Sequence, residues 1–338
     1  KNFLSLVAKY NGVIMKTKKV FLSFMMAFYA VMIFASPKAN LKKTDERFLW
    51  VITGTDKNGN ESKVYIQGTV HVATTNTCPL SDNVLKIFDE ADRHVSEMSS
   101  SDYHQIQEVI QQKTLESAKK TGLNFLSLRL TPEEQEFYKT LADEVLKEEV
   151  PDDKTARDVA FLLLNRCEPW VSVQIINAYL LSKLDLNREN GIELQFYTRL
   201  ENAGKEWDGL DSLETQVNVL LYGTYDEQLV LFKDSLHEAM DLEKTKEELN
   251  RMMTAYSSDD LDGLAECLLE DDKEKSSKNK KLYKKYNKVL ITDRNKAWIK
   301  LIKNYLDQGG TTFIFAGAAH FLGDDSVFVH LKKAKIIE

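Results

Sequence analysis

Residues 63–71, KVYIQGTVH, form a β-prone run that leads into a glycine and a histidine, which predicts a strand with a functional residue at its end. The run 48–55 before it is also β-rich, and Asn58-Gly59 between the two tolerates the positive φ of a tight turn, which predicts a hairpin. Near the other end of the chain, residues 311–316 are again apolar and β-prone, and they lead into Gly317-Ala318-Ala319-His320. We predict an α/β fold whose central mixed sheet is built from both ends of the chain.

The middle of the chain is predicted to be a large helical insertion. From residue 102 to 305, apolar residues recur at spacings of three and four. A helix over 81–92 and a buried strand over 93–98 are predicted before it, and residues 207–213 predict another short strand within it. The last 30 residues are expected to return to β structure, with a further short element beginning at 327–331.

The composition is that of a folded, acidic protein. Hydrophobic residues make up 43% of the 338 residues, which is enough for a buried core and excludes a disordered chain. Acidic residues number 52 against 45 basic ones, so the formal charge of -7 provides no net attraction to nucleic-acid phosphates. We therefore expect no nucleic-acid partner.

The N-terminal region is typical of a targeting segment. Met15-Lys16-Thr17-Lys18-Lys19 precedes an apolar run over 20–35, which ends at Ser36-Pro37. We predict a signal peptide or an uncleaved N-terminal anchor over 1–35, with cleavage after Ala35 preferred over cleavage after Ser36. Residues 1–14, ahead of Met15, are set aside as an upstream or mis-called start. Residues 36–47 are then a linker. The protein is expected to be exported, periplasmic or secreted, with membrane contact only through this segment.

Two segments at opposite ends of the chain repeat one arrangement, Gly68-Thr69-Val70-His71 and Gly317-Ala318-Ala319-His320. Each histidine follows a predicted strand, where ligands bind in α/β sheets, and imidazole binds metal or moves a proton near neutral pH. Glu97 adds a carboxylate at the end of the strand over 93–98; the alternative is an exposed acid at a helix start. His94 would point to the opposite face, and we expect it at the surface.

Several further motifs accompany these segments in a fixed order. In sequence, the whole set is Gln67-Gly68-Thr69-Val70-His71-Val72, Glu97, Glu168-Pro169-Trp170, Asn190-Gly191-Ile192-Glu193, Gly209-Leu210-Asp211-Ser212-Leu213-Glu214-Thr215-Gln216, Asp293-Arg294-Asn295 and Gly317-Ala318-Ala319-His320-Phe321-Leu322-Gly323. Together they resemble the TraB/GumN family, which is related to the Tiki and PrgY proteins. Two departures are Glu193, where the family pattern has Asp, and Gln216, which comes early in its motif. The resemblance predicts a TraB/GumN-like domain over 48–338.

The resemblance implies a fold of the type shared with erythromycin esterase and haem-binding ChaN-like proteins. It also implies metal-dependent hydrolysis of a peptide or protein substrate, as in the Tiki branch, with Mn or Co as the metal. The residues it assigns are, by role, His71 and His320 as metal ligands or base, Glu97 and Glu214 as acidic site residues, Arg294 as a stabiliser of negative charge, and Gly68, Gly317 and Gly323 as motif backbone.

Imidazole and carboxylate ligands also suit Zn, so the metal is expected to be Mn, Co or Zn. Two alternatives to an exported metal-dependent peptidase stay open at this point. The first is a non-catalytic binding protein that sequesters a peptide signal or a haem in the same cleft. The second is a purely structural envelope protein. No HExxH motif, which would fix the usual zinc-protease geometry, occurs in the sequence.

Overall fold

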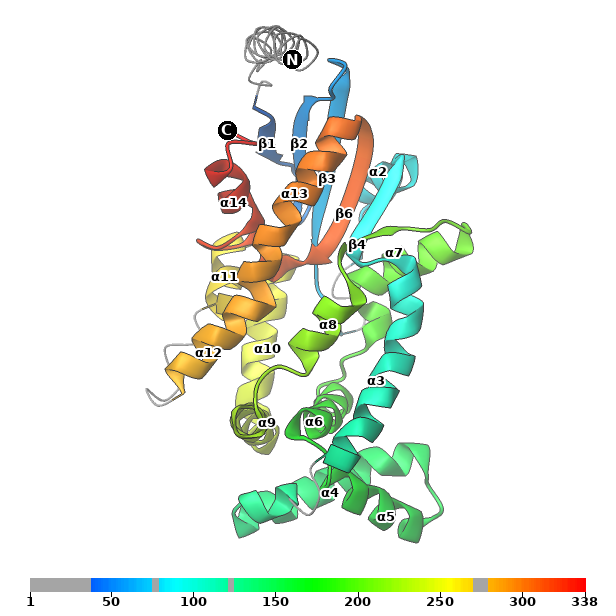
Figure 1. Ribbon diagram of the computed structural model, residues 1–338, viewed down its shortest axis with the longest axis vertical. Coiled ribbons are helices and arrows are strands. Elements are labelled where there is room, and N and C mark those ends of the chain that lie inside the picture. Colours follow the sequence, from blue (N-terminus) through cyan, green and yellow to red (C-terminus); the bar gives the residue numbers. More distant parts are fainter. Residues whose placement is uncertain (1–37, 75–78, 121–124, 270–278) are drawn as a thin grey trace, which may run out of the picture. The chain divides into compact units, whose positions relative to one another are not determined.

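The computed structural model describes residues 38–74, 79–120, 125–269 and 279–338. The expected signal peptide or anchor over 1–35 lies outside them. In the described part of the chain, six strands form one sheet in the order β1-β2-β3-β6-β4-β5 (Figure 1). Their bounds are β1 Asn40–Lys43, β2 Leu49–Thr55, β3 Glu61–Thr69, β4 Arg93–Met98, β5 Asp208–Asp211 and β6 Gly310–Gly317.

The pairing of the strands confirms an α/β fold with a mixed sheet built from both ends of the chain. Strands β1, β2 and β3 pair antiparallel, and the β2–β3 pair is the predicted hairpin. Strand β6 then lies parallel to β3 on one side and to β4 on the other, and β5 extends the sheet parallel to β4. The carboxyl ends of β3, β6, β4 and β5 therefore meet at one edge.

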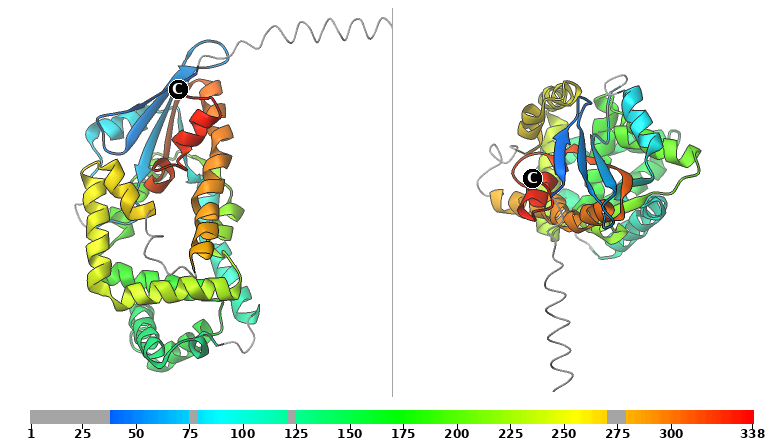
Figure 2. Two further views of the ribbon diagram at one scale, coloured as in Figure 1. Left: turned by 90° about the vertical axis from the view of Figure 1, so that its left-hand side faces the viewer. Right: turned by 90° about the horizontal axis from the view of Figure 1, so that it is seen from above.

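The helices fill the region between β4 and β6 in sequence, apart from α2 before it and α14 after it. They are α2 Asp82–Glu90, α3 Ser100–Lys120, α4 Pro132–Glu149, α5 Lys154–Leu164, α6 Pro169–Lys183, α7 Ile192–Asn202, α8 Leu213–Leu220, α9 Tyr225–Met240, α10 Leu242–Ser257, α11 Leu261–Leu269, α12 Lys280–Asn287, α13 Asp293–Gln308 and α14 Val327–Lys333. Short 3-10 turns occur at η1 Leu126–Arg129, η2 Arg188–Asn190 and η4 Ala318–Phe321, and a π-helical turn, η3 Lys288–Thr292, joins α12 to α13. Helices α10 and α13 run from the sheet toward α9 (Figure 2).

Helices cover the sheet through an aromatic core. Phe313 and Phe315 of β6 contact Phe88 of α2 and Phe196 of α7, with ring centroids 5.0–6.1 Å apart. The Phe88 and Phe196 rings lie 4.6 Å from each other. Helix α13 crosses the sheet in front of β3 and β6 (Figure 1) and buries Trp298. A second buried cluster, between α4, α6 and α9, holds the insertion together around Tyr138, Ile176, Phe232 and Leu236.

Three details differ from the expectations. Residues Asn40–Lys43, within the expected linker, form strand β1 against β2. The element at 327–331 is a helix, whose N-cap residue Ser326 accepts a hydrogen bond from the N–H of Val329. His94, expected at the surface, is 5% exposed, and its Nε2 lies 2.7 Å from the carbonyl oxygen of Phe88. The last prediction was wrong because β4 is an interior strand with both faces covered, so both sets of alternating side chains are buried.

Within the described residues, no helix combines the length and apolar character that a bilayer span requires.

The aromatic core generates a stability prediction. Phe313 is fully buried between α2, α7 and the sheet, so Phe313→Ala should lower the free energy of unfolding by about 3–5 kcal/mol through lost burial and an unfilled cavity. Leu128→Ala is the matched control: Leu128 is 74% exposed, and the change should stay within about 0.5 kcal/mol. Urea unfolding followed by circular dichroism measures both. Equal losses would contradict this assignment of the core.

Candidate functional site

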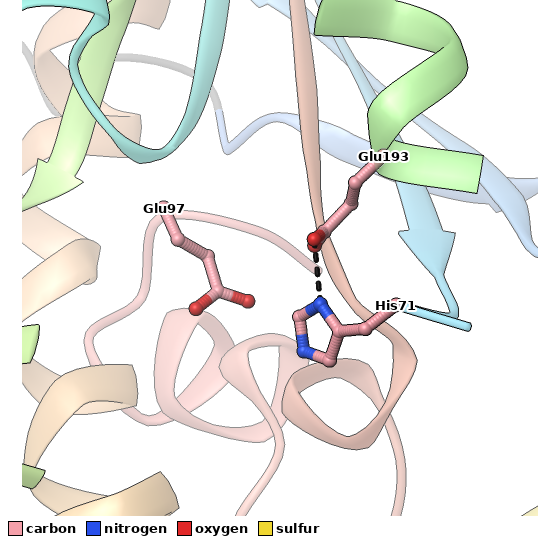
Figure 3. Close-up of side chains that lie close together, drawn as sticks. All are labelled: His71, Glu97 and Glu193. Atoms are coloured by element: carbon pink, nitrogen blue, oxygen red, sulfur yellow. Dashed lines mark hydrogen bonds and ion pairs between the residues drawn. The ribbon is translucent and has the colours of Figure 1, made fainter. Parts of the chain in front are cut away.

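The parallel strand ends gather side chains from distant parts of the sequence. Thr69 at the end of β3 is in register with Gly317 at the end of β6, and Met98 at the end of β4 is in register with Asp211 at the end of β5. Ligands in α/β folds bind outside such carboxyl ends. At this edge, His71, Glu97 and Glu193 point toward one another (Figure 3).

His71 is held beside the first turn of α7. The backbone after β3 pairs with the segment before α7 through the Ala73–Asn187 bridge and a hydrogen bond from the N–H of Ile192 to the carbonyl of Val70. Gly191 is required at this crossing, because a Cβ there would lie 2.3 Å from the carbonyl oxygen of His71. This backbone pairing places the Glu193 side chain next to the imidazole of His71.

Glu193 bridges the strand end and the histidine. Its Oε1 accepts a hydrogen bond from the Thr69 hydroxyl at 2.8 Å, and its Oε2 lies 2.6 Å from Nδ1 of His71. The carboxylate of Glu193 raises the pKa of His71 from 6.5 to about 9, against the opposing effect of burial. The His71 side chain is nevertheless 63% exposed by surface area, so it is open to a ligand.

Glu97 is fixed by donors on several sides. Its Oε1 accepts from the N–H of Gly317 at 2.9 Å, and its Oε2 accepts from the guanidinium of Arg294 and from the amide of Gln216 at 3.3 Å. Burial raises the pKa of Glu97, but Arg294 outweighs it, with smaller contributions from His320, His71 and the backbone donor, and the pKa lies well below the usual range. Glu97 is therefore ionised at neutral pH.

Arg294 links Glu97 to the end of β5. Its Nε donates to Asp211 at 2.7 Å and its NH1 donates to the carbonyl of Leu290 at 3.0 Å, while NH2 serves Glu97. The other oxygen of Asp211 accepts from the indole N–H of Trp298 at 2.7 Å. All three nitrogens of Arg294 thus serve protein acceptors, which favours a positioning role over the predicted contact with a reacting oxyanion.

His320 occupies a dry environment next to Glu97. The Asn295 amide nitrogen donates to the carbonyls of His320 and Asp325, so its oxygen faces Nδ1 of His320 at 2.6 Å as an acceptor. Nδ1 therefore carries the proton and Nε2 the lone pair, 4.0 Å from Oε1 of Glu97. Burial lowers the pKa of His320 from 6.5 to about 3, so this imidazole is neutral.

The donor set fits a divalent metal. One ligand atom each from His71, Glu97 and Glu193 lies within 4.8 Å of the other two, and a nitrogen with two carboxylates is a ligand set that Zn, Mn and Co accept. Gly317 keeps the intervening space open. A Cβ there would lie 3.3 Å from Oε1 of Glu97 and 3.6 Å from Nε2 of His71. Two acceptor atoms, Oε1 of Glu97 and Nε2 of His320, border the same space.

The predicted site residues do not all gather here. His71, Glu97, Arg294, His320 and Gly317 do, whereas Glu214 is exposed on α8 and its place in the network is taken by Asp211. Two motif glycines lie apart from the acidic group: Gly68 packs its backbone against Ala318, and Gly323 has a φ of 69° in the turn before α14.

The sequence analysis assigned no role to four residues of the site, although each lies inside one of the motifs. They are Glu193, Asp211, Gln216 and Asn295. In the sequence, Glu193 and Gln216 stand out only as departures from the family pattern. Each departure from the family pattern keeps the same functional group, a carboxylate at Glu193 and an amide at Gln216. That conservation of chemistry is a signal that these residues belong to the site.

A family comparison decides the assignment of the chain. The model described as the TraB/PrgY/gumN family matches residues 48–337. The chain belongs to this family. Among curated proteins it is similar to an uncharacterized protein of Treponema pallidum (strain Nichols), with 27% identity over 297 residues that cover 87% of this chain and 82% of that protein. No solved structure matches, so the likeness to erythromycin esterase and ChaN-like proteins stays a prediction.

The His71–Glu193 pair generates a pH prediction for the metal-free protein. Because Glu193 raises the pKa of His71 to about 9, the pair stabilises the fold fully below the unfolded value of 6.5, and this contribution is lost as pH rises through 9. Glu193→Gln should return the pKa toward 6.5. NMR titration of the histidine rings measures the pKa of His71. Glu201→Gln is the control, because Glu201 lies beside the exposed His104 and its replacement should leave the His71 titration unchanged. An unchanged His71 titration in Glu193→Gln would contradict the pairing.

Proposed function

We propose that the protein is a metal-dependent hydrolase that cleaves peptides or proteins. The observation that carries the proposal is the convergence of His71, Glu97 and Glu193 within 4.8 Å at the carboxyl edge of the sheet. Three protein ligands leave a coordination position for water, as in catalytic rather than structural metal sites. Membership of the TraB/PrgY/gumN family, to which the Tiki proteins are related, supports peptide as the substrate class.

The residues of the site have separate proposed roles. His71, Glu97 and Glu193 would hold Mn, Co or Zn, and the bound metal would lower the pKa of a water molecule and polarise a carbonyl. Neutral His320 has its lone pair on Nε2 beside Glu97, where it would accept a hydrogen bond from the attacking water and orient it. Arg294 and Asp211 hold Glu97 ionised and in place. Arg294 is thus a positioning residue.

Metal loading tests the first part of this proposal. Protein purified without chelator should contain near-stoichiometric metal, measured by mass spectrometry. His71→Ala should weaken metal binding by more than about 100-fold because it removes a ligand, and Glu193→Gln by at least about tenfold because it replaces a charged ligand oxygen with a neutral one. His104→Ala, which removes an exposed histidine away from the site, is the matched control and should retain the metal.

Turnover tests the second part. With Mn, Co or Zn restored, the protein should cleave members of a fluorogenic peptide library, and His71→Ala should abolish cleavage. His320→Ala should slow cleavage with little loss of metal if His320 orients the water; loss of metal would make it a ligand, as the sequence resemblance implies. Tight retention of peptide or haem without turnover would replace the hydrolase with a binding protein.

We also propose that the protein is exported. The three lysines within residues 16–19, followed by the apolar run 20–35, support this proposal. Expressed from Met15 in a bacterial host, the chain should reach the periplasm and begin at Ser36, as read by intact-mass and N-terminal sequencing. An unprocessed chain in the membrane fraction would indicate the anchor instead, and an unprocessed soluble chain in the cytoplasm would overturn export.

A further inference from the structure

A lysine-rich surface runs along the solvent side of α12 and α13. Helix α12, the π turn η3 and helix α13 follow one another without a break and lie along the outside of the domain (Figures 1 and 2). Every lysine between residues 280 and 308 is exposed. We call this set the basic face, and its members are Lys280, Lys281, Lys284, Lys285, Lys288, Lys296, Lys300 and Lys303.

The helix period places these lysines on one side. At 3.6 residues per turn, the four lysines of α12 span an arc of about 140°. A π turn inserts about one extra residue into a helix. With η3 counted in this way, the three lysines of α13 lie about 40–100° round from Lys280, within the same arc. The opposite side of α13 is buried and includes Trp298, Ile302 and Tyr305. The basic face is therefore one stripe, whose two halves are aligned by the π turn.

Few acidic groups compensate the charge of this stripe. Asp293 and Asp307 are the acidic residues between 280 and 308, and each pairs with a lysine. Lys285 lies 3.7 Å from Glu227 of α9. The chain as a whole has a formal charge of -7, so the positive stripe is a local exception. Five of its lysines form no ion pair with any residue that the structure describes, namely Lys280, Lys281, Lys284, Lys296 and Lys300.

The composition of the stripe indicates which anion it fits. Recognition of single phosphates favours the planar fork of arginine, and single-stranded nucleic-acid sites add aromatic rings on which bases stack. Arg294 is buried and serves protein acceptors, and the aromatic residues of α12 and α13 lie on the side away from the lysines. The exposed neighbours Ala297 and Asn304 are small or polar. Lysines without these companions are point charges, which suit an extended anionic surface.

We propose that the basic face docks the folded domain on a bilayer surface that contains anionic phospholipid. From Lys280 to Lys303 the stripe is about 35 Å long at 1.5 Å per residue, so several lipid headgroups contact it at once. Each lysine near an anionic surface strengthens binding by about fivefold. The contact is peripheral and electrostatic, since the stripe offers charge rather than large apolar side chains.

This contact is additional to the one predicted from the sequence. The sequence analysis expected membrane contact only through residues 1–35, whereas the basic face belongs to the folded domain and persists when that segment is removed. The inference does not depend on the proposed hydrolase. His71→Ala, which removes a proposed metal ligand, should therefore leave lipid binding unchanged, so that failure of the hydrolase and failure of this inference give different results.

Co-sedimentation of the purified full chain with lipid vesicles tests the inference. In about 0.1 M salt, the protein should bind vesicles of seven parts phosphatidylcholine to three parts phosphatidylglycerol at least about tenfold more tightly than vesicles of phosphatidylcholine alone. In about 1 M salt the difference should disappear, because the Debye length falls from about 10 Å to about 3 Å. Equal affinity for both vesicles at the lower salt would overturn the inference.

Lysine substitutions separate the basic face from other lysines, including those ahead of the apolar run 20–35. Lys284→Gln/Lys300→Gln removes one unpaired charge from each half of the stripe and should weaken binding to the anionic vesicles by at least about tenfold. Lys86→Gln/Lys139→Gln is the matched control, which removes the same charge from exposed positions on α2 and α4 and should change binding by less than about twofold. Equal losses in the two variants would overturn the inference.

A competition experiment distinguishes lipid from another polyanion. Double-stranded DNA is added to the protein and the anionic vesicles, at a phosphate concentration equal to that of phosphatidylglycerol. The protein should stay with the vesicles, because the stripe lacks exposed arginine and aromatic side chains. Release of the protein by DNA would overturn the assignment of a lipid surface.

Discussion

The buried ion pairs of Arg294 with Glu97 and Asp211 are the constraint on which the site depends. Transfer of charges from water into the protein interior is costly, and they remain there only when each has a partner. Loss of Arg294 would leave two carboxylates facing each other, and breaking such a pair costs about 3–5 kcal/mol. The guanidinium therefore ties the ends of β4 and β5 to the start of α13.

The same constraint ties the chemistry to complete folding. Glu97 can face His71 and Gly317 only when β6, from the C-terminal end of the chain, has inserted between β3 and β4. Helix α13, which follows the π-helical turn η3, supplies Arg294 to Glu97 and, one residue later, Asn295 to His320. Extra residues in a π turn alter the direction of the side chains that follow, and such turns occur frequently at functional sites. The first turn of α13 thus positions both the Glu97 carboxylate and the His320 imidazole.

The sequence predicted those parts of the site that depend on local pattern. His71, Glu97 and His320 follow or end β-prone runs, and strand ends can be read from composition and spacing. Glu193 and Asp211 could not be assigned roles in this way. Glu193 reaches His71 only through the backbone pairing at Ala73–Asn187, and Asp211 reaches Arg294 only because β5 lies beside β4. His94 was misplaced for a related reason: alternation along a strand identifies two faces, but only the tertiary structure shows that both are covered.

Repeated sequence does not give the two histidines equivalent chemistry. His71 lies beside Glu193 with an exposed side chain, and its pKa is raised to about 9. His320, in the matching motif, is buried against Trp298 with ring centroids 4.3 Å apart, and its pKa is lowered to about 3. A carboxylate favours the charged imidazole, whereas desolvation favours the neutral one. One ring is therefore held beside a carboxylate at an exposed position, and the other is buried with its lone pair on Nε2. The division follows from the neighbours that the helical insertion and α13 supply.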